Sequence, residues 1–211
     1  MTQKTKAAEA SSETHLSVHL VGQRPIMFDR YAGDNQTKLR PADKVYLSQE
    51  DGETLVLTSE NVMSFLGAVN TDSAPKLVTD KRKYKDLAKA LNGFVTVEQA
   101  EIAFLRDGKP IKFVARSKLL DNPDAYDAET KLYISNKVPR LPKGIPNPNR
   151  RPVLELPWEL KLDLTAFQHP DPSINILESL RACFDRGGKC IGFGTYRGVY
   201  GKFSVERWEE L

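Results

Sequence analysis

The stretch from Leu154 to Leu164 has the strictest pattern in the chain and constrains the fold most. Apolar residues occupy every second position there, and the residues between them are charged or proline. Side chains alternate between the two faces of a strand, so this period of two predicts a long strand with one buried face. Pro157 has no backbone N–H to donate to a sheet, so we expect an edge position or a β-bulge around it.

Helical and strand patterns alternate along the rest of the chain. Apolar residues recur with helical spacing after Ser59, after about Asp80 and after Ser173, and Gly187-Gly188 is expected to end the last helix. Further strands are predicted at Leu16–Val21, Leu55–Leu57, Phe94–Val97, Ile102–Leu105, Ile111–Val114, Lys131–Val138, Cys190–Phe193 and Lys202–Trp208. Strand–helix–strand units with antiparallel returns predict an α+β fold, a ferredoxin-like or RRM-like antiparallel sheet with helices on one face and loop insertions.

We expect a single domain over residues 16–211. Residues 1–15 are polar, without the apolar run of a signal peptide, and predict a disordered tail. Residues 139–152 are rich in proline and contain basic but no acidic residues, which predicts an extended, exposed loop. Forty per cent of the residues are hydrophobic, which is enough for a packed core in the remainder.

Several classes of protein are disfavoured by what the sequence contains. The two cysteines, Cys183 and Cys190, and the three histidines show neither a disulfide framework nor zinc-ligand spacing. No run approaches the roughly 20 apolar residues that span a bilayer. Motifs of nucleophilic catalysis and of phosphate-binding loops are missing. We therefore expect a soluble cytoplasmic protein with no cofactor, no metal and no enzymatic activity.

The glycine-rich segment IGFGTYRGVYGKFSVERW near the end of the chain carries the strongest functional signal. Gly192, Gly194, Gly198 and Gly201 permit unusual backbone angles and close approach of a ligand to the main chain. Arg197 and Lys202 supply charge for phosphate groups, while Tyr196 and Tyr200 offer stacking faces. Interleaved basic and aromatic groups are typical of single-stranded nucleic-acid binding. The alternative is a glycine-containing hairpin whose aromatic residues belong to the core.

The net charge of +3 is modest, but the charges are unevenly distributed. Basic residues concentrate in the segments 76–89, 138–152 and 186–208, and acidic residues in the segments 50–60 and 121–129. Within the proline-rich loop, Arg140, Lys143, Arg150 and Arg151 are placed to close over a phosphate backbone, unless the loop is simply solvated. The lysines of the helix after Asp80 are more typical of a solvent-facing helix surface.

Three segments carry a resemblance to a known family: VHLVGQRPIMFDRY, RRPVLELPWELKLDL and IGFGTYRGVYGKFSVERW. Together they cover about a quarter of the chain and resemble the RAMP superfamily, particularly the Cas7-like backbone proteins of CRISPR complexes and related phage-encoded proteins. The resemblance implies a modified RRM sheet that binds single-stranded RNA or DNA as repeated subunits. It also implies contacts from Arg24, from the Arg140–Arg151 loop, and from Tyr196, Arg197 and Lys202. The bulky tyrosines depart from the usual glycine-rich loop of the family.

The sequence thus predicts a non-catalytic protein that binds single-stranded nucleic acid, as a homo-oligomer or filament, with no membrane partner. The expected nucleic-acid-binding residues are Arg24, Arg140, Lys143, Arg150, Arg151, Tyr196, Arg197, Tyr200 and Lys202. Two alternatives stay open. One is a structural or assembly protein of the phage virion type. The other is an RNA-processing enzyme of the same fold that uses His15, His19 or His169.

Overall fold

A mixed α+β fold is built around a six-stranded antiparallel sheet in the computed structural model, which describes residues 13–34, 36–68, 81–122, 124–136 and 149–211. β1 (Glu13–Gly22) lies between β11 (Glu159–Phe167) and β12 (Phe203–Glu210). β4 (Val95–Val97) pairs with the end of β11. The spatial order β12-β1-β11-β4, with helical crossovers before β4 and β12, is the ferredoxin-like split βαβ arrangement. The predicted fold class is confirmed.

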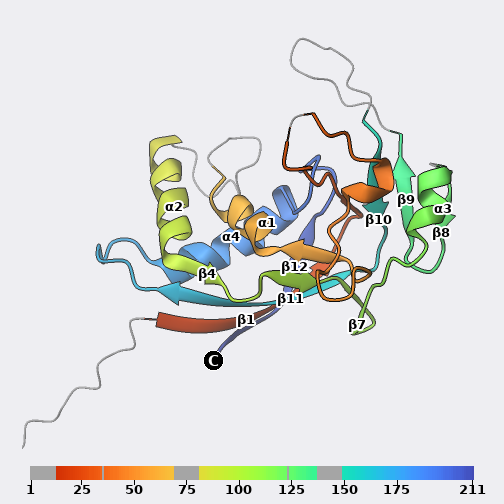
Figure 1. The fold of residues 1–211 in the computed structure, drawn as a ribbon. Coiled ribbons are helices and arrows are strands. Elements are labelled where there is room, and N and C mark those ends of the chain that lie inside the picture. Colours follow the sequence, from red (N-terminus) through yellow and green to blue (C-terminus); the bar gives the residue numbers. More distant parts are fainter. Residues whose placement is uncertain (1–12, 35, 69–80, 123, 137–148) are drawn as a thin grey trace, which may run out of the picture.

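In the described part of the chain, three helices cover one face of this sheet (Figure 1). They are α1 (Ser59–Leu66), α2 (Lys81–Phe94) and α4 (Ile176–Cys190). The leucines of β11 that alternate with charged residues are at most 1% exposed, because they point toward these helices. This burial of apolar surface is the main stabilising contribution to the fold. Among the described residues no helix is long and apolar enough to cross a membrane.

The expected end of α4 at Gly187-Gly188 is wrong. Both glycines are buried inside the helix, which continues to Cys190. A Cβ on Gly188 would lie 2.6 Å from the ring of Phe203, so the glycine allows α4 to pack closely on β12. The predicted strand at Cys190–Phe193 is consequently wrong as well, since its first residue is helical.

The predicted strand Leu154–Leu164 is two strands in different sheets. β10 (Arg151–Leu154) ends before Pro157, and β11 begins after it. Proline cannot donate to a ladder, so the chain leaves one sheet there and enters the other. The buried Trp158 holds this crossing in place through its Nε1, which donates to the carbonyl oxygen of Arg24 at 2.9 Å.

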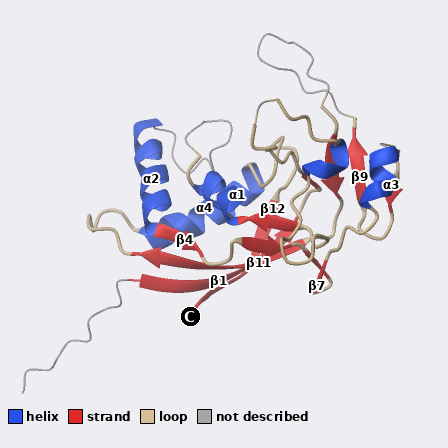
Figure 2. Cartoon of the chain, in the orientation of Figure 1, coloured by secondary structure: helices blue, strands red, loops and turns tan. Residues whose placement is uncertain are grey.

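A second antiparallel sheet, which the sequence did not predict, has the order β2-β10-β9-β8. Its other strands are β2 (Ile26–Met27), β9 (Leu132–Ser135) and β8 (Tyr126–Asp127). Figure 2 shows this sheet, with α3 (Arg116–Asp121), at the end of the molecule opposite to α2. The remaining short elements are η1 (Pro41–Lys44), β3 (Val56–Thr58), β5 (Glu101–Ala103), β6 (Leu105–Arg106) and β7 (Lys109–Pro110).

The limits of the expected tail and loop differ from the structure. β1 begins at Glu13, so residues 13–15 belong to the main sheet and not to a disordered tail. Arg151 and Pro152 belong to β10, where they pair with β9, and not to the proline-rich loop. Arg140 and Lys143 lie outside the described residues.

Candidate nucleic-acid interface

The glycine-rich segment lies as a loop against β2. Residues 191–202, all of them described, contain no strand, so the segment is not a regular hairpin. The backbone N–H of Thr195 donates to the carbonyl oxygen of Met27 at 2.9 Å, and that of Gly201 donates to Pro25 at 2.8 Å. These bonds attach the loop to the edge of the second sheet, beside the start of β12.

Backbone crowding explains why the loop needs its glycines. A Cβ on Gly201 would lie 2.0 Å from the carbonyl oxygen of Phe193, and a Cβ on Gly194 would lie 2.4 Å from that of Met27. Both glycines also have positive φ angles, +69° and +77°. Only glycine accommodates this combination without strain, so the main chain of the loop is held firmly against its neighbours.

The two tyrosines of the loop have opposite surroundings. Tyr200 is 6% exposed and packs with Met27 and Val153, against the partly buried Tyr133. Its ring has no free face for a base, so the expected stacking role of Tyr200 does not fit the structure. Tyr196 is 45% exposed, with its ring centroid 6.0 Å from that of Tyr200. Its φ of 54° is a strained conformation of the order of 1–3 kcal/mol for a non-glycine residue, and such strain clusters at functional sites.

Arg197 is a partly buried cation without an acidic partner among the described residues. Its Nε donates to the carbonyl oxygen of Gly194 at 3.2 Å, and its Nη2 donates to the hydroxyl of Ser64 on α1 at 3.5 Å. Burial lowers the pKa of this guanidinium. Within the described residues no carboxylate oxygen lies within 4.0 Å of it. A partly buried charge with no acidic partner is less well stabilised than one in water, so an anion from outside would stabilise this position.

Arg24 belongs to the chain segment 24–30, and Lys202 and Arg150 lie beside its two ends. The backbone N–H of Arg24 donates to Lys202 at 3.2 Å at one end of this segment. At the other end, Lys44 links Arg30 to Arg150. Its carbonyl oxygen accepts from the backbone N–H of Arg30 at 2.9 Å, and its Nζ donates to the carbonyl oxygen of Arg150 at 3.1 Å. The six Cα-to-Cα steps of this segment span at most about 20 Å when fully extended, which limits the distance between its two ends.

We call Arg24, Arg150, Tyr196, Arg197 and Lys202 the basic strip. In the part of the chain that the structure describes, none of its four cations has a carboxylate oxygen within 4.0 Å. The strip therefore joins unneutralised positive charge to one exposed aromatic ring along the edge of the second sheet. Proteins that bind single-stranded nucleic acid commonly combine the same two features.

Arg151, also expected to bind nucleic acid, has an internal partner instead. Its Nε donates to Asp29 Oδ2 at 2.7 Å, and its side chain is 12% exposed. The ion pair ties β10 to the chain that follows β2. Arg151 is therefore not part of the basic strip.

The face of the main sheet that points away from the helices is a poor platform for bases. RRM proteins stack bases on aromatic residues of the sheet. On β1 and β11, which are fully described, this face carries mainly polar and charged side chains, among them Glu159, Lys161 and Asp163. Phe167, at the end of β11, is aromatic. Carboxylates in this position repel phosphate. The candidate interface of this chain therefore lies elsewhere than the sheet face that RRM proteins use.

The histidines proposed for acid–base catalysis do not share a site. His15 Nδ1 is 2.9 Å from Thr165 Oγ1, and His19 Nε2 is 2.8 Å from Glu159 Oε2. His169 packs on Phe94 with ring centroids 4.6 Å apart. The described residues also contain no cluster of three or more histidine, cysteine or acidic side chains suited to a metal ion.

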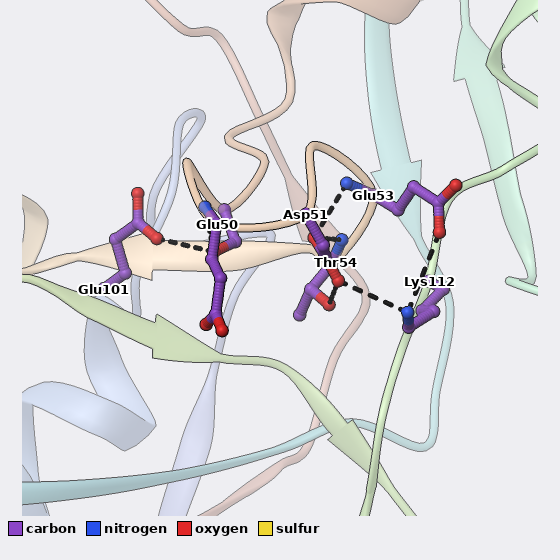
Figure 3. A network of polar contacts seen from close by, with 7 residues as sticks. Glu50, Asp51, Glu53, Thr54, Glu101 and Lys112 are labelled. Carbon is purple, nitrogen blue, oxygen red and sulfur yellow. Dashed lines mark hydrogen bonds and ion pairs between the residues drawn. The ribbon is translucent and has the colours of Figure 1, made fainter.

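Within the acidic segment 50–60, the carboxylate of Asp51 is held by its own turn (Figure 3). Asp51 accepts from the Thr54 hydroxyl at 2.7 Å and lies 3.3 Å from the Nζ of Lys112. The Thr54 hydroxyl and the neighbouring backbone N–H groups hold the pKa of Asp51 well below its usual range. Glu101 of β5 accepts from the Ser48 hydroxyl at 2.8 Å and fastens the start of the turn. These carboxylates stabilise a loop and are not part of the basic strip.

Comparisons with known proteins show the fold and no family membership. No protein-family model and no curated protein matches the sequence. Among solved structures 48 chains match. One belongs to the cryo-EM structure of the type III-B Cmr-beta bound to cognate target RNA, with a TM-score of 0.53 and 9% sequence identity. The match covers 95% of this chain and 61% of that chain, so nearly the whole fold is shared with part of a longer protein.

Proposed function

We propose that this protein binds single-stranded RNA through the basic strip, without catalysing a reaction on it. The four cations neutralise phosphates, and the ring of Tyr196 stacks on a base. The observation that carries the proposal is Tyr196 itself, an exposed ring held in a strained conformation beside the unpaired Arg197. A stacking ring needs an unpaired base, which favours a single strand over a duplex.

The choice of RNA rests on the structural match together with the family resemblance. The matched chain comes from an assembly bound to target RNA, and its fold extends over nearly all of this chain. The RAMP resemblance lies partly in the segments that form the basic strip, namely the chain after β1 and the glycine-rich loop. The same resemblance supports assembly of several copies along one strand.

If several copies of the protein assemble along one strand, the mass of the complex depends on the length of the RNA. In mass photometry, we expect complexes on longer single strands to grow by whole numbers of protein copies, because each copy occupies a fixed length of strand. One copy per strand at every RNA length would contradict the assembly part of the proposal and leave the binding part intact.

Replacing Tyr196 by asparagine is expected to lower the affinity for single-stranded RNA about 5- to 150-fold, since base–aromatic stacking contributes roughly 1–3 kcal/mol per base. Asparagine tolerates the positive φ angle, so the substitution removes the ring without adding backbone strain. Fluorescence anisotropy with labelled RNA measures the change. The matched control is Phe167→Ala, which removes an exposed ring from the main sheet. Equal affinities of Tyr196→Asn and the unaltered protein would exclude Tyr196 as a stacking residue.

A further inference from the structure

A hollow of about 590 Å³ lies at the Arg150 end of the basic strip, between the chain after β2 and the chain before β10. Residues that line it include Arg30, Tyr31, Lys38, Lys44, Asn149 and Arg150. Its volume falls in the range of small-ligand sites. The segment after β2 runs beside β10, since the N–H of Phe28 donates to Pro152 at 2.9 Å. In Figure 1 this segment is drawn in red to orange next to β10.

An ion network connects residues that line the hollow with Arg151 of β10. Asp29 accepts from Arg151 at 2.7 Å and lies 3.5 Å from the Nζ of Lys44. Lys44 also donates to the side chain of Asn149 and to the carbonyl oxygen of Arg150. The side chain of Lys44 is 13% exposed, so its charge and that of Arg151 are held below the surface. Asp29 is thereby shared by two cations.

The rim of the hollow keeps an excess of positive charge. Arg30, Lys38 and Arg150 have no carboxylate oxygen within 4.0 Å among the described residues. Arg30 is fixed by its Nε, which donates to the carbonyl oxygen of Asp43 at 3.1 Å. The carboxylate of Asp34 accepts from Thr37, and this side-chain hydrogen bond lowers its pKa. Four cations, Arg30, Lys38, Lys44 and Arg150, thus line the hollow against the two carboxylates of Asp29 and Asp34.

Tyr31 adds an aromatic ring to this charged rim and is 61% exposed. A guanidinium and a ring beside a space of this size suit a phosphate and a base of one nucleotide. We propose that the hollow holds one nucleotide of the bound single strand, with its phosphate between Arg30 and Arg150 and its base on Tyr31. This inference rests on the proposed function and extends the strip by a defined nucleotide site.

The test measures the affinity of labelled single-stranded RNA for the full chain over a series of salt concentrations. Arg30→Gln is expected to reduce the slope of log K against log salt by about 0.7, the contribution of one phosphate contact to a single strand. Tyr31→Ala is expected to lower the affinity about 5- to 150-fold. Lys161→Gln, on the helix-free face of the main sheet, is the control and should change neither quantity.

The outcomes separate this site from the basic strip. If the unaltered protein binds RNA and Tyr196→Asn weakens binding, but Arg30→Gln and Tyr31→Ala do not, the nucleotide site is overturned while the proposed function stands. If the unaltered protein does not bind single-stranded RNA, both are overturned. Tyr31 is exposed, so Tyr31→Ala keeps the test decisive even if Arg30→Gln lowers the melting temperature.

Discussion

Replacing Arg24, Arg150 and Lys202 together by glutamine is expected to lower the affinity for single-stranded RNA roughly a hundredfold at about 0.1 M salt. Each phosphate contact on a single strand contributes a slope of about −0.7 to log K against log salt. Three lost contacts therefore remove about two units of slope, and the affinity loss is largest at low salt. Anisotropy titrations between about 50 and 200 mM salt measure both quantities.

The matched control removes the same amount of charge elsewhere on the molecule. Lys85 and Lys89 are exposed on α2, and Lys161 is exposed on β11. Their joint replacement by glutamine should leave the slope nearly unchanged, because none of them lies on the basic strip. Equal losses from the two triple variants would mean that RNA responds only to net charge, which would contradict a localised interface.

Gly201→Ala is expected to destabilise the fold by about 2–4 kcal/mol. The new Cβ would lie 2.0 Å from the carbonyl oxygen of Phe193, and φ is +69°. Either the glycine-rich loop or the chain it packs against has to move. The loop carries Tyr196 and Arg197, so RNA affinity should fall together with stability. Urea denaturation followed by circular dichroism measures the change in the free energy of unfolding.

Gly108→Ala separates backbone strain from crowding. Gly108 has a similar φ of +74°, but its Cβ would meet nothing within 4 Å. The alanine variant should therefore be destabilised only by the strain of a positive φ angle, about 1 kcal/mol. If both alanine variants are destabilised equally, close packing of the loop is not what makes Gly201 necessary.

Local periodicity predicted the class of fold and the type of its main strands and helices, but not where β10 gives way to β11 or where α4 ends. The alternation in β1 and β11 and the helical spacing in α4 are properties of each segment alone, so the sequence reveals them. The second sheet could not be predicted in this way. Two of its strands, β2 and β8, have two residues each, too few for a period to be visible.

The candidate site was predictable only where the signal is local. Tyr196 and Arg197 stand out because basic and aromatic residues alternate with glycines there. The burial of Tyr200 against Met27 depends on a partner more than 170 positions away in the sequence. The pairing of Arg151 with Asp29 is likewise a long-range contact. No pattern within one segment distinguishes such a residue from an exposed one.

The most direct test of the central claim compares labelled single-stranded and double-stranded RNA of the same sequence by fluorescence anisotropy, over a range of salt concentrations. We predict tight binding to the single strand that weakens as salt rises, and clearly weaker binding to the duplex. Equal affinity for both forms, or no binding of the single strand at low salt, would contradict the proposal that the basic strip binds single-stranded RNA.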